Sequence, residues 1–202
     1  MKGTLIIPAF FALGIILGMY GQLPTNLISS DLSTYTLYLL MFLAGVGIGA
    51  DRKSWHILRS INIKIFLVPA GIIIGTFAGV TLASLLLPSL QLREIWAVGA
   101  GFGYYSLSAI FISKLHSETL GLVALLSNIF REIFTLLMTP LLVKYFGNLA
   151  GIASGGATSM DTTLPVISKY SGKDYAIISL FSGIVLTILV PIFVSFILTA
   201  GK

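Results

Sequence analysis

Two carboxylates stand inside apolar stretches of this sequence, and both could take part in proton or cation chemistry. Asp161 lies in SGGATSMDTTLP, between Ser154 and Pro165, and Glu132 lies within a long apolar run. An ionisable side chain at membrane depth is costly and usually lines a pathway, so each is a candidate site residue. A carboxylate in a low dielectric holds a proton more tightly than in water, which favours exchange of that proton for a substrate ammonium group.

The backbone around Asp161 is expected to be partly unwound. The pair Gly155–Gly156 disfavours a continuous helix, and Pro165 has no N–H group to donate. Unwound backbone at membrane depth is tolerated only where protein or a water-filled cavity satisfies its polar groups. The hydroxyls of Thr158 and Ser159 in this segment are therefore candidate binding groups. The alternative interpretation is a short solvated loop between two spans.

A second glycine-rich stretch, GAGFGYYSLS, interrupts the apolar run at 96–113. Its glycines lower the helix propensity, and a helix facing lipid would not favour the hydroxyls of Tyr104 and Ser106. These two side chains are candidate site residues. The stretch is a second candidate break in a helix.

The apolar run at 120–143 carries a stripe of polar side chains. The residues that share one face at about 100° per residue are Asn128, Glu132, Thr135 and Thr139. Arg131 lies at the edge of this stripe, which must face protein or water. Asn128, Arg131 and Glu132 are therefore candidate substrate- or proton-binding residues. The alternative is a structural ion pair that joins two helices.

Composition places these residues in a polytopic membrane protein. Hydrophobic residues make up 56% and charged residues 9% of the 202 residues, and the mean hydropathy is +1.01. These values exclude an ordinary soluble domain. The chain has no cysteine, which excludes a thiolate metal site, and its two histidines lie in different contexts, so no metal centre is expected. The net charge of +5 comes from Lys and Arg at the ends of apolar runs, which indicates membrane orientation rather than nucleic-acid binding.

The predicted fold is all-α, with about seven transmembrane segments in one transporter domain that covers residues 1–202. The predicted spans are 4–19, 34–49, 63–87, 96–113, 120–143, the Asp161 segment and 176–198. A secretory signal peptide is the alternative for the first run, but no small-x-small cleavage site follows it.

Basic residues favour a cytoplasmic amino terminus and an outside carboxyl terminus, because cytoplasmic loops carry an excess of Lys and Arg. On this topology Arg93, Lys144 and Lys202 lie outside. The eight inside are Lys2, Arg52, Lys53, Arg59, Lys64, Lys114, Lys169 and Lys173. If the Asp161 segment alone re-entered the membrane, the bias would weaken to seven against four, so a crossing is preferred.

Three blocks of the sequence carry a family resemblance. They are GFGYYSLSAIFIS at 101–113, NIFRE at 128–132 and GGATSMDTTLPVI at 155–167. In this order they resemble the lysine exporter family of bacterial inner-membrane transporters, of the LysO type. The likeness covers essentially the whole chain and corresponds to the carboxyl-terminal two-thirds of the long members. It implies that the intramembrane glutamate and aspartate of the family fall on Glu132 and Asp161.

The resemblance implies export of L-lysine, and of analogues such as thialysine, across the inner membrane by proton antiport. Protons are the expected coupling ion and Na⁺ the alternative, with no bound cofactor. The implied fold is that of cation/proton antiporters and bile-acid-type transporters, with inverted repeats and discontinuous helices. On that analogy the first span, with Pro8 and Gly14, would cross the Asp161 segment.

The sequence and the resemblance also lead to expectations about binding partners and alternative functions. L-lysine and membrane lipid are the expected partners, together with a small membrane subunit that supplies further amino-terminal spans, or a second copy of the chain. The alternative function is a structural or regulatory subunit of a two-component transporter. An intramembrane aspartyl protease would also need two acidic residues, but the Gly-x-Gly-Asp pattern is missing, because Met160 precedes Asp161. No enzyme activity is expected.

Overall fold

The computed structural model describes residues 63–200 and seven isolated helical positions within the first 46 residues. The chain divides into two compact units, 1–46 and 47–202, and the second unit contains all the elements named below. The spans predicted at 4–19 and 34–49, the basic cluster at 52–59 and Lys202 lie outside the described residues, apart from those seven positions. The prediction that the first span crosses the Asp161 segment therefore stays a prediction.

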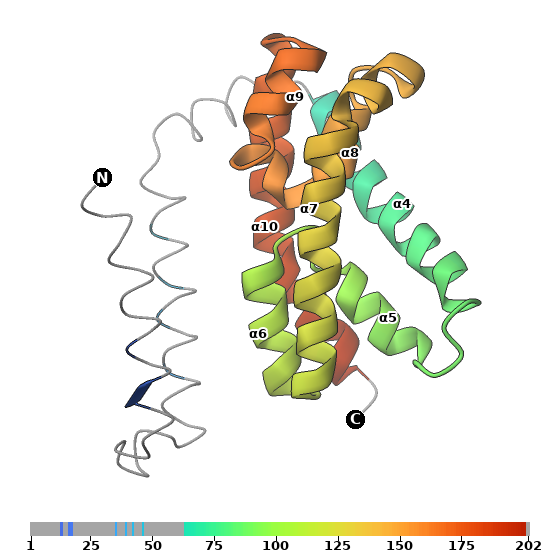
Figure 1. Cartoon of the computed structure of the whole chain (residues 1–202), viewed down its shortest axis with the longest axis vertical. Helices are drawn as coiled ribbons and strands as arrows, with labels where there is room; N and C mark the ends of the chain where they lie inside the picture. Colours follow the sequence, from blue (N-terminus) through green and yellow to red (C-terminus); the bar gives the residue numbers. More distant parts are fainter. Residues whose placement is uncertain are drawn as a thin grey trace. The chain divides into compact units, whose positions relative to one another are not determined.

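The described part of the second unit is helical throughout, without strands (Figure 1). Its elements are η2 (Ile63–Phe66), α4 (Leu67–Ser84), α5 (Leu92–Gly99), α6 (Tyr105–Leu115), α7 (Glu118–Phe146), α8 (Ala150–Gly155), η3 (Gly156–Met160), α9 (Leu164–Ser171) and α10 (Asp174–Thr199). Within the described residues, α4, α7 and α10 are long and apolar enough to cross a membrane. At 29 and 26 residues, α7 and α10 extend about 43 and 39 Å, more than the thickness of the hydrocarbon core.

Helices α5 and α6 form a hairpin that returns to the end from which it starts. His116, directly after α6, lies 2.7 Å from Glu94 in the first turn of α5, measured from Nε2 to Oε1. Arg93 donates from Nε to the Ile197 carbonyl near the end of α10 at 2.6 Å, so three chain segments meet at this end. The two arms have 8 and 11 residues and reach about 12 and 17 Å, roughly half the hydrocarbon core.

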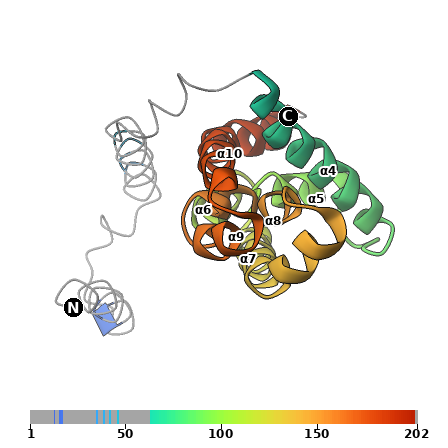
Figure 2. The ribbon, with the colours of Figure 1, turned by 90° about the horizontal axis from the view of Figure 1, so that it is seen from above.

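The segment from α8 to α9 enters from the opposite end. Helix α7 starts beside the end of α6 and runs the full length, so α8 begins at the far end. Helix α10 finishes beside Arg93, so its start, and with it the end of α9, also lies at the far end. Figures 1 and 2 together show α8 and α9 stacked over the tips of α5 and α6.

This arrangement corrects the predicted topology. The segments predicted to cross at 96–113 and around Asp161 each fold back as short helices, and of the five spans predicted after residue 62 three are helices long and apolar enough to cross a membrane. Hydropathy gives the apolar length of a segment but not its direction. The reversal comes from left-handed backbone at the tips, where φ is 46° at Phe102, 100° at Gly103 and 61° at Gly156.

Candidate functional site

The tips of the two hairpins contact each other through their backbones. The amide of Ala157 donates to the carbonyl of Phe102 at 2.8 Å. A Cβ atom on Gly103 would lie 2.8 Å from the carbonyl oxygen of Gly155, and one on Gly156 would overlap the Phe102 carbonyl. Glycine at 103 and 156 is therefore what allows the tips to meet.

Both breaks fall where the glycine-rich stretches predicted them. The first lies between the end of α5 at Gly99 and the start of α6 at Tyr105. In the second, η3 follows α8, and α9 begins only at Leu164. Pro165 stands in the first turn of α9, where its missing N–H group removes no helical hydrogen bond. The prediction of unwound backbone around Asp161 is confirmed.

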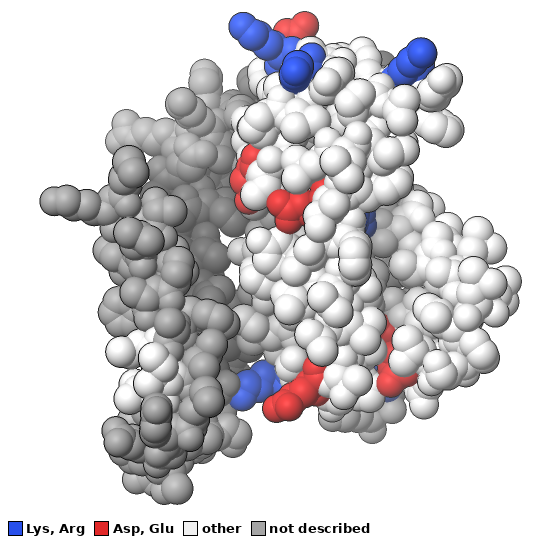
Figure 3. All heavy atoms as spheres, in the orientation of Figure 1, with Lys and Arg blue, Asp and Glu red and all other residues white. Residues whose placement is uncertain are grey.

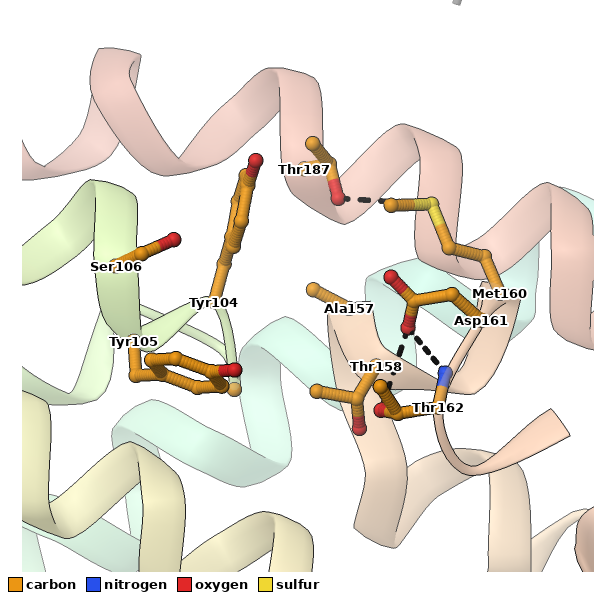
Figure 4. A pocket seen from close by; sticks show the side chains of 10 residues that line it. Tyr104, Tyr105, Ser106, Ala157, Thr158, Met160, Asp161, Thr162 and Thr187 are labelled. Carbon is orange, nitrogen blue, oxygen red and sulfur yellow. Dashed lines mark hydrogen bonds between the residues drawn. The ribbon is translucent and has the colours of Figure 1, made fainter. Parts of the chain in front are cut away.

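A pocket lies beside the contact between the tips (Figure 4). It is lined by residues of both tips and of α10, namely Gly103, Tyr104, Tyr105, Ser106, Ala157, Thr158, Met160, Asp161, Thr162 and Thr187. Its empty volume, which includes space open to solvent, is about 330 Å³. Four of the predicted site residues, Tyr104, Ser106, Thr158 and Asp161, are thus brought together.

Asp161 offers one carboxylate oxygen to this pocket. Its Oδ1 accepts a hydrogen bond from the amide of Thr162 at 2.6 Å. Figure 4 shows the other oxygen directed into the space between Tyr104 and Thr187. Among the described residues no basic side chain forms an ion pair with Asp161. The carboxylate is therefore placed to accept a cation or a proton.

The facing wall of the pocket is the uncapped start of α6. Tyr104, the residue before the helix, makes no side-chain cap, and the first helical hydrogen bond runs from the amide of Ser108 to the carbonyl of Tyr104. No described residue accepts a hydrogen bond from the amides of Ser106 and Leu107. Free amides at a helix start favour an anion such as a carboxylate.

Ser159 lies behind the pocket rather than in it. The side chain is fully buried, and its hydroxyl donates to the carbonyl of Ser179 in α10 at 3.0 Å. The hydroxyl of Ser179 donates in return to the carbonyl of Ser159 at 2.7 Å. This reciprocal pair anchors η3 to α10.

Asn128 holds the tip of the first hairpin. Its Oδ1 accepts from the amide of Gly103 at 2.7 Å, and its Nδ2 donates to the carbonyl of Ala124 at 2.8 Å. The side chain is only 4% exposed and does not line the Asp161 pocket. Its observed contacts are those of a positioning residue.

Arg131, one turn further along α7, holds the second hairpin. Its Nε donates to the carbonyl of Ser154 at 2.8 Å and its Nη2 to that of Ala153 at 3.0 Å. These carbonyls close the carboxyl end of α8, where a positive charge is favourable. Helix α7 therefore positions both tips.

Glu132 stands apart from both sets of contacts. It is partly exposed, and within the described residues it makes no hydrogen bond or ion pair. The ion pair expected as the alternative for Arg131 and Glu132 is not found there. Asn128, Thr135 and Thr139 are buried, so the polar stripe faces protein as predicted, with Glu132 at its margin.

Thr187 of α10 is the main pocket residue that sequence reasoning missed. No site residue is predicted on the last span, but Ser179, Ser182 and Thr187 are all buried on it. Hydroxyls at this spacing lie within one broad face of a helix, so the pattern was present in the sequence. Tyr105, Met160 and Thr162 also line the pocket and are not among the predicted site residues.

Comparison with known proteins supports the resemblance. The family model for the lysine exporter LysO matches residues 8–198. The chain is 31% identical over 170 residues to the lysine exporter LysO of Escherichia coli, covering 83% of this chain and 55% of that protein. It is 28% identical over 164 residues to a putative lysine exporter of Haemophilus influenzae, covering 80% of this chain and 82% of that protein.

The chain thus spans about half the length of the Escherichia coli relative. No solved structure matches it. The matching family is one of transporters, which fits the expectation that the chain is not an enzyme. Because the family model extends over almost all of its residues, the chain belongs to the lysine exporter LysO family.

Proposed function

We propose that this chain exports L-lysine, and analogues such as thialysine, across the bacterial inner membrane in exchange for protons. Two relatives are named as lysine exporters, one of them as putative. The observation that carries the proposal is the position of Asp161 opposite the free amides of α6 across one pocket. A carboxylate facing amide donors matches the ammonium and carboxylate groups of an amino acid.

Asp161 on one wall of the pocket and the start of α6 on the other would bind the two ends of the substrate. The α-carboxylate of lysine accepts hydrogen bonds from the amides of Ser106 and Leu107, and an ammonium group pairs with Asp161. The side chains of Tyr104 and Thr187 lie across the pocket from the Asp161 carboxylate, and their hydroxyls supply further hydrogen bonds to the substrate (Figure 4).

Proton coupling follows from competition for one carboxylate. Asp161 binds either a proton or an ammonium group, so arrival of a proton from outside releases lysine. Export of one positive charge against 100 mV costs about 2.3 kcal/mol, so lysine efflux needs an inward charge. Glu132, without a partner among the described residues, is proposed as a second proton carrier, and Na⁺ is the alternative coupling ion.

The re-entrant hairpins also bear on orientation. If both segments re-enter the membrane instead of crossing it, the carboxyl terminus stays outside. Lys114 then lies outside and Lys144 inside, the reverse of the crossing topology. With the first two spans as predicted, the bias stays at eight basic residues inside against three outside. Figure 3 shows basic side chains at the end formed by α8, α9 and the start of α10, which we assign to the cytoplasm.

Growth of a lysine-sensitive host that lacks its own exporter tests this function. Expression of the chain should confer thialysine resistance, and purified chain should exchange lysine for protons in vesicles. Resistance that requires a co-expressed small membrane protein would support the predicted partner. Lack of flux with and without such a partner would favour a structural or regulatory subunit.

A further inference from the structure

A second pocket lies between α4, α5 and α7 and shares no lining residue with the Asp161 pocket. Its empty volume is about 690 Å³. Most of its wall is aliphatic, with Val80, Ile95, Val98 and Val123 among the lining residues. Its polar groups include Thr76 and Arg131, which lie within hydrogen-bond distance of each other at 3.4 Å.

The charge of Arg131 is only partly compensated. Within the described residues no carboxylate forms an ion pair with it. Its compensation comes from two carbonyls at the end of α8, a helix of six residues. Of the five N–H groups of a guanidinium, three point to Ser154, Ala153 and Thr76, which leaves two. Arg131 is half-buried, and a charge removed from water is normally paired, so the pocket favours an anion.

The same features make this pocket unsuitable for lysine. No acidic side chain lines it, so the ammonium groups of lysine would meet Arg131 without a counter-charge. The aliphatic wall favours an apolar chain instead. Thr76 and Ala83 of α4 both line the pocket, and the helix rises about 10 Å between them. A chain of several methylene groups can lie along this length.

We propose that this pocket binds a medium-chain aliphatic monocarboxylate. Its carboxylate accepts hydrogen bonds from the two remaining N–H groups of Arg131, and its chain lies along the valine side chains. Because Arg131 also holds the end of α8, occupancy is linked to the hairpin that carries Asp161. The site is therefore placed to regulate the first pocket without competing with substrate.

Equilibrium dialysis of radiolabelled octanoate against the purified full chain in a non-ionic detergent tests this site. Saturable binding is expected with about one octanoate per chain, and excess unlabelled octanoate should displace the label. Octanol and octylamine, which share the chain but lack the carboxylate, should not displace it. Equal displacement by octanol would mean a non-specific apolar site and would overturn the proposal.

Substitutions of pocket residues test whether octanoate binds in this pocket. Val123→Trp, and Val80→Phe on the facing helix, should each fill the pocket and reduce octanoate binding at least tenfold. Leu122→Trp is the matched control, because Leu122 is 55% exposed and does not line the pocket, and it should bind octanoate like wild type. Wild-type binding by both pocket variants, or absence of saturable binding to the wild-type chain, would contradict the assignment.

Discussion

The amide of Gly103 donates a 2.7 Å hydrogen bond to Oδ1 of Asn128, which ties the tip of the α5–α6 hairpin to α7. One turn later, Arg131 ties α8 to the same helix. Helix α7 therefore sets the distance between the two tips, and with it the distance between Asp161 and the start of α6. This relationship makes α7 the scaffold of the proposed lysine site.

Asn128→Ala should destabilise the protein and slow transport. Loss of the side chain leaves the buried amide of Gly103 without an acceptor, which costs about 1–3 kcal/mol. The thermal unfolding midpoint and the maximal rate of lysine flux should both fall. Ser127→Ala, at the exposed neighbouring position, should change stability by less than about 0.5 kcal/mol. Wild-type stability of Asn128→Ala would show that the Gly103 bond does not hold the tip.

Gly156→Ala should separate the hairpin tips. The new Cβ would overlap the carbonyl of Phe102, and the backbone conformation, with φ 61° and ψ −123°, costs a residue with a side chain about 1–3 kcal/mol. Gly75→Ala in α4 is the control, because nothing lies within 4 Å of its added Cβ. Alanine in a helix interior is favoured by about 0.5–1 kcal/mol over glycine, so this variant should be at least as stable as wild type. Equal unfolding midpoints for the two variants would argue against the tip contact.

Single cysteines can separate the re-entrant topology from the crossing topology, since the natural chain has no cysteine. Thr119 and Asn148 are exposed near the two ends of α7. In intact cells an impermeant thiol reagent should label Thr119→Cys and Thr199→Cys, but Asn148→Cys only after permeabilisation. The crossing topology predicts the reverse for Thr119 and Asn148, so labelling of Asn148→Cys with protection of Thr119→Cys would contradict the hairpins.

Glu94 should make stability depend on acid pH. The hydrogen bond from the Gln91 amide, and then the contact with His116, hold the pKa of the Glu94 carboxyl below its usual range. Because the pKa is lower in the folded state, ionised Glu94 stabilises the fold at any pH above its unfolded-state pKa of about 4.3. This stabilisation is lost as the pH falls through the folded-state pKa. The unfolding midpoint of Glu94→Gln should therefore differ from wild type at pH 7 and converge with it at acid pH. A constant difference from pH 3 to 7 would exclude this role.

The breaks were predictable, but the path of the chain was not. Glycines at 155 and 156 and the GAGFG run marked both interruptions, because glycine lowers helix propensity and adopts positive φ. Crossing and re-entry leave the same apolar length on either side of a break, so hydropathy could not distinguish them. The reversal depends on tertiary contacts such as the bond between Gly103 and Asn128.

The candidate site was predicted in part for a similar reason. Asp161, Tyr104 and Ser106 stood out because polar groups are rare in this chain, and they share one pocket. Arg131 and Ser159 stood out equally, yet they hold the backbone around the pocket. A sequence shows that a polar group needs a partner within the membrane, but it does not show whether that partner is substrate or backbone.

Lysine-driven proton movement in vesicles containing the purified chain tests the central claim most directly. Wild type should move protons against the direction of lysine, and Asp161→Asn should abolish this exchange while the protein remains inserted. Asp174→Asn, at an exposed carboxylate at the start of α10, is the matched control and should exchange like wild type. Wild-type exchange by Asp161→Asn would contradict the assignment of Asp161 as the shared proton and ammonium site.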